Sequence, residues 1–299
     1  MKEKVIAITG PTASGKTKIA IELAKKLGTE IISGDSMLVY RGLDIGTAKP
    51  TLAEMEGIPH HLIDIIEPTE NFTVVDFLRL AKSEITRLNQ AGKIPIIAGG
   101  TGFYLKSLLE GYLFPAEDGK ERQELEAVYQ QKGLAGLVEL LSDDAKASLN
   151  KSDRQNPHRL LRAIEKERAG YIPSKAANFP YHFLAIGLSW ERATLYDRIN
   201  LRIDQMLASG FIDEVKGLLE QYPKELRPLN AIGYKEIIAY LDGNLSYDEM
   251  REEAKKSTRH FAKRQFTWYK KMPYIKWLEM EGKSVENVVE IILADEFFS

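Results

Sequence analysis

The stretch Gly10-Pro11-Thr12-Ala13-Ser14-Gly15-Lys16-Thr17 decides the fold of this chain. It matches the phosphate-binding pattern G-x-x-x-x-G-K-[ST] at every position. The apolar residues 5–9 precede it, and residues 18–27 follow with apolar side chains at helical spacing before Gly28. A strand–loop–helix unit of this kind presents backbone N–H groups and a helix N-terminus to phosphate oxygens. The chain is therefore predicted to bind a phosphate group at this loop, called the P-loop below.

Two side chains of the P-loop have separate predicted roles. Lys16 is expected to neutralise a bridging or terminal phosphate, and the Thr17 hydroxyl to ligate Mg²⁺. Such a loop normally accompanies an apolar strand that ends in an Mg²⁺-binding Asp. The apolar run at residues 94–98 is followed by Gly99-Gly100-Thr101 instead.

Composition limits the class of protein. The 299 residues are 44% apolar and 28% charged, which is typical of an ordinary folded protein. There is no cysteine, which excludes disulfides, zinc ribbons and thiol catalysis and is compatible with a reducing compartment. Neither a signal peptide nor an apolar run of membrane-spanning length is visible. We expect a cytoplasmic protein with no membrane partner.

The order of apolar segments predicts an α/β fold. Strands are expected at residues 5–9, 30–36, 61–66, 94–99 and 182–188. Helices are expected at 18–27, at 73–92 with Thr73 as N-cap, and at 101–109 after the fourth strand. Alternation of this kind is typical of a parallel sheet with helices on both faces. Residues 116–180 read as charged amphipathic helices, for example at 121–132, 134–141 and 156–168. We therefore expect an inserted all-helical subdomain there and a P-loop core over residues 1–115 and 181–299. Helices are expected to fill the C-terminal region, at residues 192–209, 212–222, 232–241 and 247–272, and Ser246 and Glu249 predict a capping box at the start of the last one.

Four further residues are candidates for chemistry. Asp35 follows the second strand and should face the cleft at the carboxyl ends of the strands, where it could take a proton from a nucleophile, cap a turn or hold Mg²⁺ through water. Thr101 could cap a helix or hydrogen-bond a substrate, and the residues alone slightly favour the cap. Arg198 and Arg202 are four positions apart on one helix flank, which suits phosphate contacts but is more often a solvated surface.

The C-terminal region is basic. Residues 251–276 contain nine Lys and Arg but two Glu, with a basic residue every four positions at Arg251, Lys255, Arg259 and Lys263. Arg264, Lys270 and Lys271 extend the charge, and aromatic residues lie between them; some of these, such as Phe261 and Trp268, follow core spacing. Arg159, Arg162 and Lys166 form a second, smaller basic face. Basic residues pair with phosphates and aromatics stack on unpaired bases, so a polyanionic partner is expected.

Several motifs together resemble one family. They are the P-loop, Asp35-Ser36-Met37, Val39-Tyr40-Arg41, Gly46-Thr47-Ala48-Lys49-Pro50, Pro59-His60-His61, Gly99-Gly100-Thr101-Gly102 with Tyr104, Asn156-Pro157-His158-Arg159, Gly233-Tyr234-Lys235-Glu236, and Ala262-Lys263-Arg264-Gln265 with Thr267-Trp268. In this order, from residue 5 to about residue 277, the chain closely resembles the tRNA dimethylallyltransferases.

The resemblance implies transfer of a dimethylallyl group from dimethylallyl diphosphate to the exocyclic N6 of an adenine beside the anticodon, with release of pyrophosphate. The P-loop would hold the diphosphate, with Lys16, Mg²⁺ at Thr17, and Arg198 or Arg202 stabilising the leaving group. Asp35 would deprotonate the amine and Thr101 would orient it. The helical insertion and the basic helix would grip the anticodon stem-loop. The implied tRNA-binding residues are Asp35, Ser36, Met37, Leu38, Thr101, His158, Arg159, Arg162, Arg259, Lys263 and Arg264.

Two departures from the family pattern are visible. Leu38 stands where the family usually has Gln, which removes one amide that could contact RNA. The zinc finger common in eukaryotic members is absent, so the chain resembles the compact bacterial form, and we expect a monomer. Three rival functions remain at this point: a small-molecule kinase with a P-loop, an isopentenyltransferase acting on free adenine nucleotides, and a non-enzymatic RNA-binding nucleotide switch.

Overall fold

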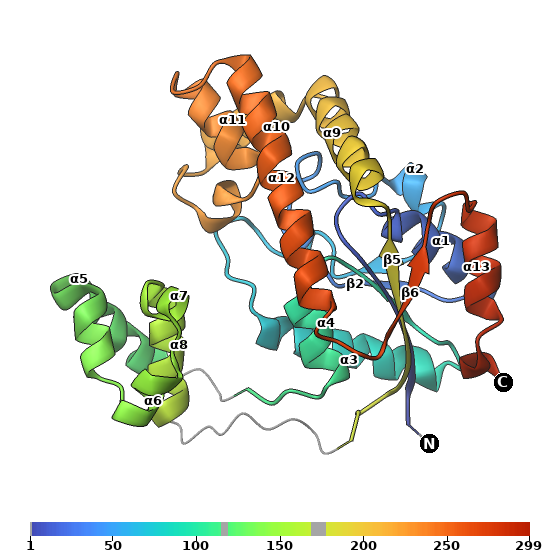
Figure 1. Ribbon diagram of the computed structural model, residues 1–299, viewed down its shortest axis with the longest axis horizontal. Coiled ribbons are helices and arrows are strands. Elements are labelled where there is room, and N and C mark those ends of the chain that lie inside the picture. Colours follow the sequence, from blue (N-terminus) through green and yellow to red (C-terminus); the bar gives the residue numbers. More distant parts are fainter. Residues whose placement is uncertain (1, 115–118, 169–177) are drawn as a thin grey trace. The chain divides into compact units, whose positions relative to one another are not determined.

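The computed structural model describes residues 2–114, 119–168 and 178–299, and the chain divides into two compact units. The larger unit contains Met1–Glu110 and Phe179–Ser299, and the smaller one is Gly111–Asn178 (Figure 1). The boundary predicted between residues 115 and 116 lies outside the described residues. Each unit is described separately below.

The larger unit is built on a six-stranded parallel sheet with the strand order β3-β2-β4-β1-β5-β6. The strands are β1 (Lys4–Thr9), β2 (Ile31–Ser33), β3 (His60–His61), β4 (Ile96–Ala98), β5 (His182–Ser189) and β6 (Ile275–Glu279). Residues 5–8 of β1 are fully buried, as expected for a central strand covered on both faces. The predicted parallel α/β sheet is confirmed.

Helices cover the sheet as the alternating pattern predicts. Thr73 caps α3 in a capping box with Asp76, and Ser246 does the same for α12 with Glu249, as the sequence indicates. The helices of this unit are α1 (Lys16–Leu27), α2 (Leu52–Met55), α3 (Val74–Gln90), α4 (Gly102–Leu109), α9 (Arg192–Ala208), α10 (Phe211–Gln221), α11 (Tyr234–Leu241), α12 (Tyr247–Tyr269) and α13 (Val285–Leu293).

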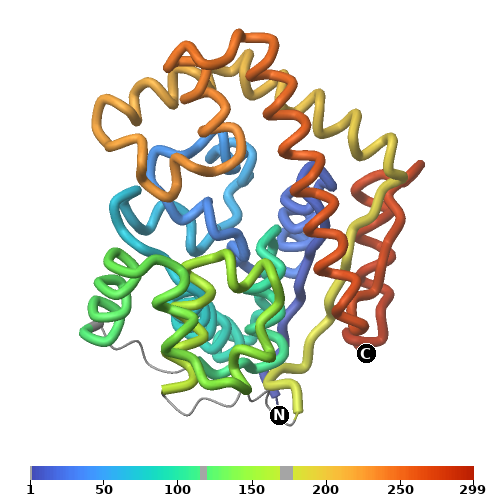
Figure 2. The backbone as a smooth tube through the Cα atoms, turned by 60° about the vertical axis from the view of Figure 1, so that its left-hand side comes forward, coloured from blue at the N-terminus to red at the C-terminus, as the bar shows by residue number. Residues whose placement is uncertain are grey.

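The expectation that only helices follow residue 192 is wrong, because β6 is a strand. Helix α12 ends at Tyr269, three residues before the predicted end, and β6 then pairs in parallel with β5 at the sheet edge (Figure 2). The run is five residues long and one of its side chains, Ile275, is buried. Apolar runs of that length carry little periodicity of their own.

The predicted third strand is mostly wrong as well. Residues 61–66 were expected to be extended, but β3 contains only His60 and His61. Leu62 and Asp64 have φ values of 64° and 54°, a left-handed conformation that interrupts a strand. The chain turns there and hydrogen-bonds to the loop at Leu38 and Val39.

The smaller unit is helical over its described residues. It contains α5 (Gly119–Glu139), α6 (Asp143–Ser148), α7 (Lys151–Arg154) and α8 (Pro157–Arg168), with a kink in α5 at Gly133, where φ is 64°. The predicted helices at 121–132, 134–141 and 156–168 are confirmed, and the kink separates the first two. The core of this unit is made of six buried aliphatic side chains: Leu125, Leu137, Leu141, Leu160, Leu161 and Ile164.

Candidate active site

A pocket of about 420 Å³ lies at the carboxyl edge of the sheet in the larger unit. Three neighbouring strands, β2, β4 and β1, end there, and the segments that follow them line the pocket. Ligands of open parallel sheets bind at this edge, where the order of the strands reverses. The predicted site residues that line the pocket are Thr12, Ala13, Lys16, Thr17, Asp35, Ser36, Met37, Leu38, Thr101, Arg202 and Arg264.

The P-loop conformation depends on its glycines. Gly10 and Gly15 have φ values of 145° and 94°, which favour glycine. A Cβ atom at Gly10 would lie 2.7 Å from the carbonyl oxygen of Leu188, so the loop has no room for a side chain there. The loop then runs directly into α1, whose first residue is Lys16.

The Lys16 ammonium is folded back onto its own loop. Its Nζ donates to the carbonyl oxygens of Gly10 and Pro11, at 3.0 and 2.8 Å. Burial lowers the pKa of Lys16 to about 7, and repulsion from Arg202 adds to this effect, while Asp35 opposes it. An anion in the pocket would favour the charged form of this lysine.

The two arginines of α9 occupy different places. Arg198 Nε donates to the carbonyl oxygen of Ala13 at 2.9 Å, and its guanidinium lies 4.3 Å from the ring centroid of Trp190. Arg202 lines the pocket, and burial lowers its pKa while Asp35 and Glu54 act in the opposite direction. Arg198 therefore holds the outside of the P-loop, and Arg202 supplies charge to the pocket. The solvated-flank alternative is wrong for Arg202, which lines the pocket. Arg198 is exposed, as that alternative expects, but it also contacts the P-loop.

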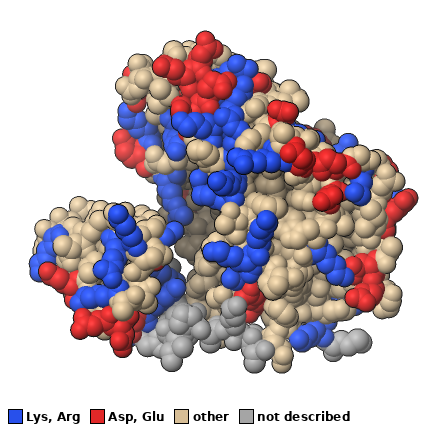
Figure 3. All heavy atoms as spheres, in the orientation of Figure 1, with Lys and Arg blue, Asp and Glu red and all other residues tan. Residues whose placement is uncertain are grey.

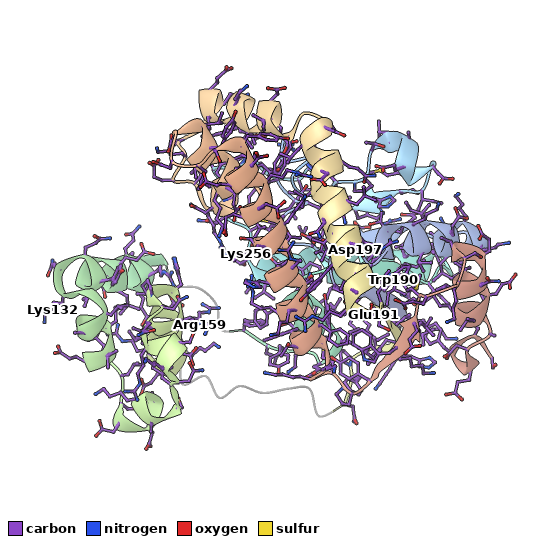
Figure 4. The ribbon with its side chains drawn as sticks, turned by 45° about the horizontal axis from the view of Figure 1, so that its top comes forward. Lys132, Arg159, Trp190, Glu191, Asp197 and Lys256 are labelled. Carbon is purple, nitrogen blue, oxygen red and sulfur yellow. The ribbon has the colours of Figure 1, made fainter. Side chains whose placement is uncertain are left out.

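Trp190 is a further support of the P-loop that sequence reasoning missed. Its indole Nε1 donates to the carbonyl oxygen of Ser14 at 3.0 Å. Trp190 lies where β5 ends and α9 begins (Figure 4), so it joins the central sheet to the loop. Its position directly after an apolar strand is the one sequence signal that could have identified it.

Asp35 and Thr101 are brought together by the close approach of β2 and β4. Thr101 N donates to the carbonyl oxygen of Gly34, and Thr101 Oγ1 accepts from Ser36 N at 3.0 Å and donates to Ser36 Oγ at 3.2 Å. Thr101 is the N-cap residue of α4, but no hydrogen bond joins its side chain to that helix, so the expectation that its hydroxyl caps the helix is wrong. Thr101 instead fixes the backbone beside Asp35, whose Oδ1 accepts from Met37 N at 2.9 Å.

Gln265 of α12 joins the P-loop to the loop after β4. Its Oε1 accepts from Thr12 N at 2.8 Å, and its Nε2 donates to the carbonyl oxygen of Gly100 at 2.9 Å. The side chain is 7% exposed, so both bonds are shielded from water. A glutamine inside a basic helix gives no sequence signal for this role.

The pocket also has an apolar wall that sequence analysis did not identify. Its members come from α9, α10, the segment before α11 and the first residue of α11: Ile199, Ile203, Met206, Phe211, Ile232 and Tyr234. A Cβ atom at Gly46 would lie 2.3 Å from Phe211 and 2.5 Å from Tyr234. Only glycine allows the residue 44–48 loop to pass this wall so closely.

Glu214 of α10 fixes the same loop. Its carboxylate accepts hydrogen bonds from the backbone N–H groups of Asp44, Ile45 and Gly46, at 3.1, 2.6 and 3.2 Å. It also accepts from Tyr234 Oη at 2.6 Å. Burial raises the pKa of Tyr234 above its usual range, and the negative charge of Glu214 raises it further. This hydroxyl therefore remains protonated and acts as a donor.

The residues suit Mg²⁺ binding at Thr17. Among the described residues no group of three or more His, Cys, Asp or Glu could hold a metal. Thr17 and Asp35 nevertheless face the same pocket, and Mg²⁺ is commonly held by one or two protein oxygens together with phosphate oxygens and waters. The pocket thus fits an ion that arrives with a diphosphate.

The basic stripe of α12 divides into two halves. Arg251 and Lys255 form ion pairs with Asp204, at 2.6 and 3.0 Å, and the Lys255 side chain is buried. Arg259 donates to Asn200 Oδ1 at 2.6 Å, while Lys263 is exposed and Arg264 lies with its guanidinium 5.8 Å from the Phe261 ring. The N-terminal half of the stripe is therefore structural, contrary to expectation.

The core spacing of Phe261 and Trp268 does not bury these two side chains. Both side chains are 37% exposed, whereas Tyr269 is fully buried. Phe266 packs edge-on against Trp277 of β6, with 5.1 Å between ring centroids. Phe261 lines the candidate active site and Trp268 lies on the outer face of α12, so both rings are available to a ligand.

In the smaller unit, acidic side chains pair with arginines of the second basic face and offset part of its positive charge. Arg159 on α8 (Figure 4) pairs with Asp153 at 2.7 Å, and Arg162 pairs with Glu165 at 2.9 Å. His158 Nδ1 lies 3.4 Å from the Arg122 guanidinium. Burial, with repulsion from Arg162, lowers the pKa of Lys166. This face is more mixed in charge than its sequence indicates.

Comparisons with known proteins point to one family. The IPP transferase family model matches residues 38–272. A tRNA dimethylallyltransferase from Geobacillus kaustophilus is 43% identical over 301 residues, covering 97% of this chain and 96% of its own. The crystal structure of a tRNA isopentenylpyrophosphate transferase from Bacillus halodurans matches with a TM-score of 0.75 and 42% identity, over 97% of this chain and 94% of that one. A eukaryotic dimethylallyltransferase acting on tRNA matches with a TM-score of 0.82 and 28% identity, over 98% of this chain and 78% of that one.

Proposed function

This chain belongs to the IPP transferase family, and we propose that it prenylates tRNA. It transfers a dimethylallyl group from dimethylallyl diphosphate to the exocyclic N6 of an adenine adjacent to the anticodon, and it releases pyrophosphate. The observation that supports this most is the composition of one pocket. P-loop groups, a carboxylate at Asp35 and an apolar wall from α9 to α11 line the same space.

Each part of the pocket suits one part of the reactants. Backbone N–H groups of the P-loop, with Lys16 and Arg202, receive the diphosphate, whose charge grows as the carbon–oxygen bond breaks. The apolar wall takes the five-carbon chain and keeps water from the allylic carbon. Arg198 acts indirectly, since its hydrogen bond to Ala13 holds the P-loop in shape.

Asp35 is the proposed general base. The N6 nitrogen forms a bond to the allylic carbon, the electrons of the broken carbon–oxygen bond remain on pyrophosphate, and the Asp35 carboxylate receives the proton that the amine loses. Thr101 positions this carboxylate through Ser36, and it also faces the pocket, where it can orient the amine. Ser36, Met37 and Leu38 line the entry of the adenine.

Mg²⁺ is the proposed cofactor, held by the Thr17 hydroxyl together with diphosphate oxygens. When bound, it supplies positive charge against the leaving group. The protein's own contribution is to keep Thr17 beside Lys16 at the start of α1, so that both meet the same diphosphate.

The tRNA is held by two basic regions. On α12, Arg259, Lys263 and Arg264 contact the backbone of the anticodon stem-loop, and on α8, His158, Arg159 and Arg162 contact it from the smaller unit. The target base must leave its stack to enter the pocket. Within the described residues no helix is long and apolar enough to cross a membrane, and we propose a cytoplasmic monomer.

The function is tested by incubating the protein with Mg²⁺, radiolabelled dimethylallyl diphosphate and unmodified tRNA, with AMP in a parallel reaction. Label is expected in tRNA and not in AMP. Label in AMP alone would overturn the tRNA assignment in favour of a nucleotide-specific isopentenyltransferase. Label in neither, with ATP consumed and a small acceptor phosphorylated, would identify a kinase.

A further inference from the structure

A second, smaller pocket lies on the outer face of α12, beside the candidate active site. It has a volume of about 220 Å³ and is lined by Lys263, Arg264, Thr267, Trp268 and Lys271. That volume is below the roughly 300–1,000 Å³ typical of pockets for whole small molecules. The lining residues recur at three- and four-residue spacing, so they form one face of the helix end.

Trp268 forms the floor of this pocket. A Cβ atom at Gly102 would lie 2.1 Å from Trp268 Cδ1, so the indole rests directly on the start of α4. Phe103 packs edge-on against it, with 6.3 Å between ring centroids and 79° between the planes. The indole is still 37% exposed and Phe103 is 44% exposed. Two exposed aromatic rings held in this way offer a rigid surface for a flat apolar group.

The charge around Trp268 is positive throughout. Lys106 Nζ lies 5.9 Å from the Trp268 ring centroid. In the part of the chain that the structure describes, Lys263, Arg264 and Lys271 form no ion pair with a carboxylate, whereas Arg251, Lys255 and Lys256 of the same helix all do. Lys and Arg side chains gather over this side of the larger unit (Figure 3). The pocket therefore favours an anion joined to a flat ring.

Arg264 connects the two pockets. It lines the candidate active site together with Asp35 and Thr101, and it also lines the smaller pocket together with Trp268. Thr101 is the N-terminal neighbour of Gly102, on which the indole rests. A ligand in the smaller pocket is thus adjacent to whatever occupies the active site.

We propose that the Trp268 pocket binds a nucleotide immediately next to the acceptor adenosine, with its base stacked on the indole and its phosphate near Lys263 and Lys271. This inference rests on the proposed function, because the nucleotide in the Trp268 pocket is the neighbour of the adenine that enters the active site. An adenine drawn out of its stack leaves its neighbours unstacked, and an aromatic surface replaces part of the lost stacking. The pocket thereby sets the register of the RNA strand.

The inference is tested by a cycle of protein and RNA changes. Wild-type and Trp268→Ala proteins are compared on an anticodon stem-loop that is intact or abasic at the 5′ or the 3′ neighbour of the target adenosine. With wild type, one of the two abasic RNAs should bind about 5- to 100-fold more weakly than the intact RNA, the range of one aromatic–base stack. With Trp268→Ala, intact and abasic RNA should bind alike.

Two further variants separate stacking from folding. Trp268→Phe keeps an aromatic ring on α4 and should retain most of the binding and the sensitivity to the abasic site. Lys271→Ala changes an exposed side chain and should lower the slope of log Kd against log salt by about 0.7, one phosphate contact to a single strand. The KM for dimethylallyl diphosphate should be unchanged in both.

Equal sensitivity of wild type and Trp268→Ala to both abasic RNAs would overturn the inference, as would an unchanged salt slope in Lys271→Ala. Binding is read by fluorescence anisotropy of labelled RNA, without turnover. Failure of wild type to prenylate intact RNA would instead overturn the proposed function, and the binding cycle would still decide the role of Trp268.

Discussion

Gln265 accepts a 2.8 Å hydrogen bond from the backbone N–H of Thr12, a residue 253 positions earlier in the chain. The same side chain donates to Gly100 O, so one carboxamide joins two loops that both line the pocket. Helix α12 thereby becomes part of the active-site framework. Its outer face remains available for RNA.

Replacing Gln265 should damage both stability and turnover. Gln265→Ala leaves a buried donor and a buried acceptor unsatisfied, which costs about 1–3 kcal/mol for each group. Gln265→Glu keeps the bond from Thr12 but loses the one to Gly100. Urea unfolding and kcat/KM measure the two effects. Gln205→Ala, an exposed glutamine on α9, serves as the control and should change neither; comparable losses in control and test variants would contradict the bridging role.

Diphosphate affinity should depend on pH through Lys16. The pKa of about 7 applies to the folded protein without an anion, and a bound diphosphate raises it because the charged form is then favoured. Binding therefore takes up a proton above pH 7, and pyrophosphate affinity should fall as pH rises from 7 to 9. Isothermal titration calorimetry in buffers of different ionisation enthalpy measures the uptake.

Lys16→Arg is the matched control, because a guanidinium remains charged over this pH range. If it binds pyrophosphate at all, its affinity should lose most of the dependence on pH. The same pH profile in wild type and Lys16→Arg would show that another group is responsible. Lys16→Ala is expected to abolish transfer, and unchanged turnover there would contradict the P-loop assignment.

How far the sequence predicts this molecule depends on the range of the interactions involved. The P-loop unit, the N-cap of α3 at Thr73 and the capping box of α12 are local patterns, so they are predicted correctly. The strand β6 owes its conformation to pairing with β5, and the Gln265 bridge depends on a contact between distant segments, neither of which a local pattern contains. The sequence shows that Lys255 is charged, but its burial beside Asp204 depends on how α12 packs against α9.

Neutralising the exposed half of the basic stripe should weaken RNA binding. Arg259→Gln with Lys263→Gln removes two cations from the side proposed to meet phosphates, which should reduce the slope of log Kd against log salt by about 1.4–1.8. Lys256→Gln is the control, since this lysine is paired with Glu253 on the same helix. Binding is measured with an anticodon stem-loop from about 50 to 200 mM salt, over which loss of phosphate contacts changes affinity strongly.

That prediction distinguishes RNA contact from a general charge effect. An unchanged salt slope in the double variant would mean that this face does not meet phosphates. A similar decrease in Lys256→Gln would mean that the net charge of the helix, not its exposed half, determines affinity.

The Glu214 network should stabilise the wall of the pocket. Glu214→Ala removes a carboxylate that accepts from three backbone N–H groups and from Tyr234, and it should lower the free energy of unfolding by about 2–3 kcal/mol. Tyr234→Phe removes one of these donors and should cost about 1 kcal/mol. Urea unfolding measures both.

A substrate readout completes this test. Because Gly46, Thr47 and Ala48 line the pocket, the KM for dimethylallyl diphosphate should rise in Glu214→Ala. Glu220→Ala, an exposed glutamate on the same helix, is the control. Stability and KM equal to those of the control would refute the role assigned to Glu214.

The central claim is that this pocket joins a five-carbon prenyl group to adenine N6 with Asp35 as the base. It is tested most directly by digesting tRNA after reaction with wild type or Asp35→Asn and analysing the nucleosides by mass spectrometry, with tRNA binding measured alongside. Wild type should yield N6-dimethylallyladenosine at the adenosine beside the anticodon, and Asp35→Asn should bind tRNA normally but lose at least about 100-fold in product, the scale of general-base catalysis. Wild-type product at any other position, or undiminished product from Asp35→Asn, would contradict the account.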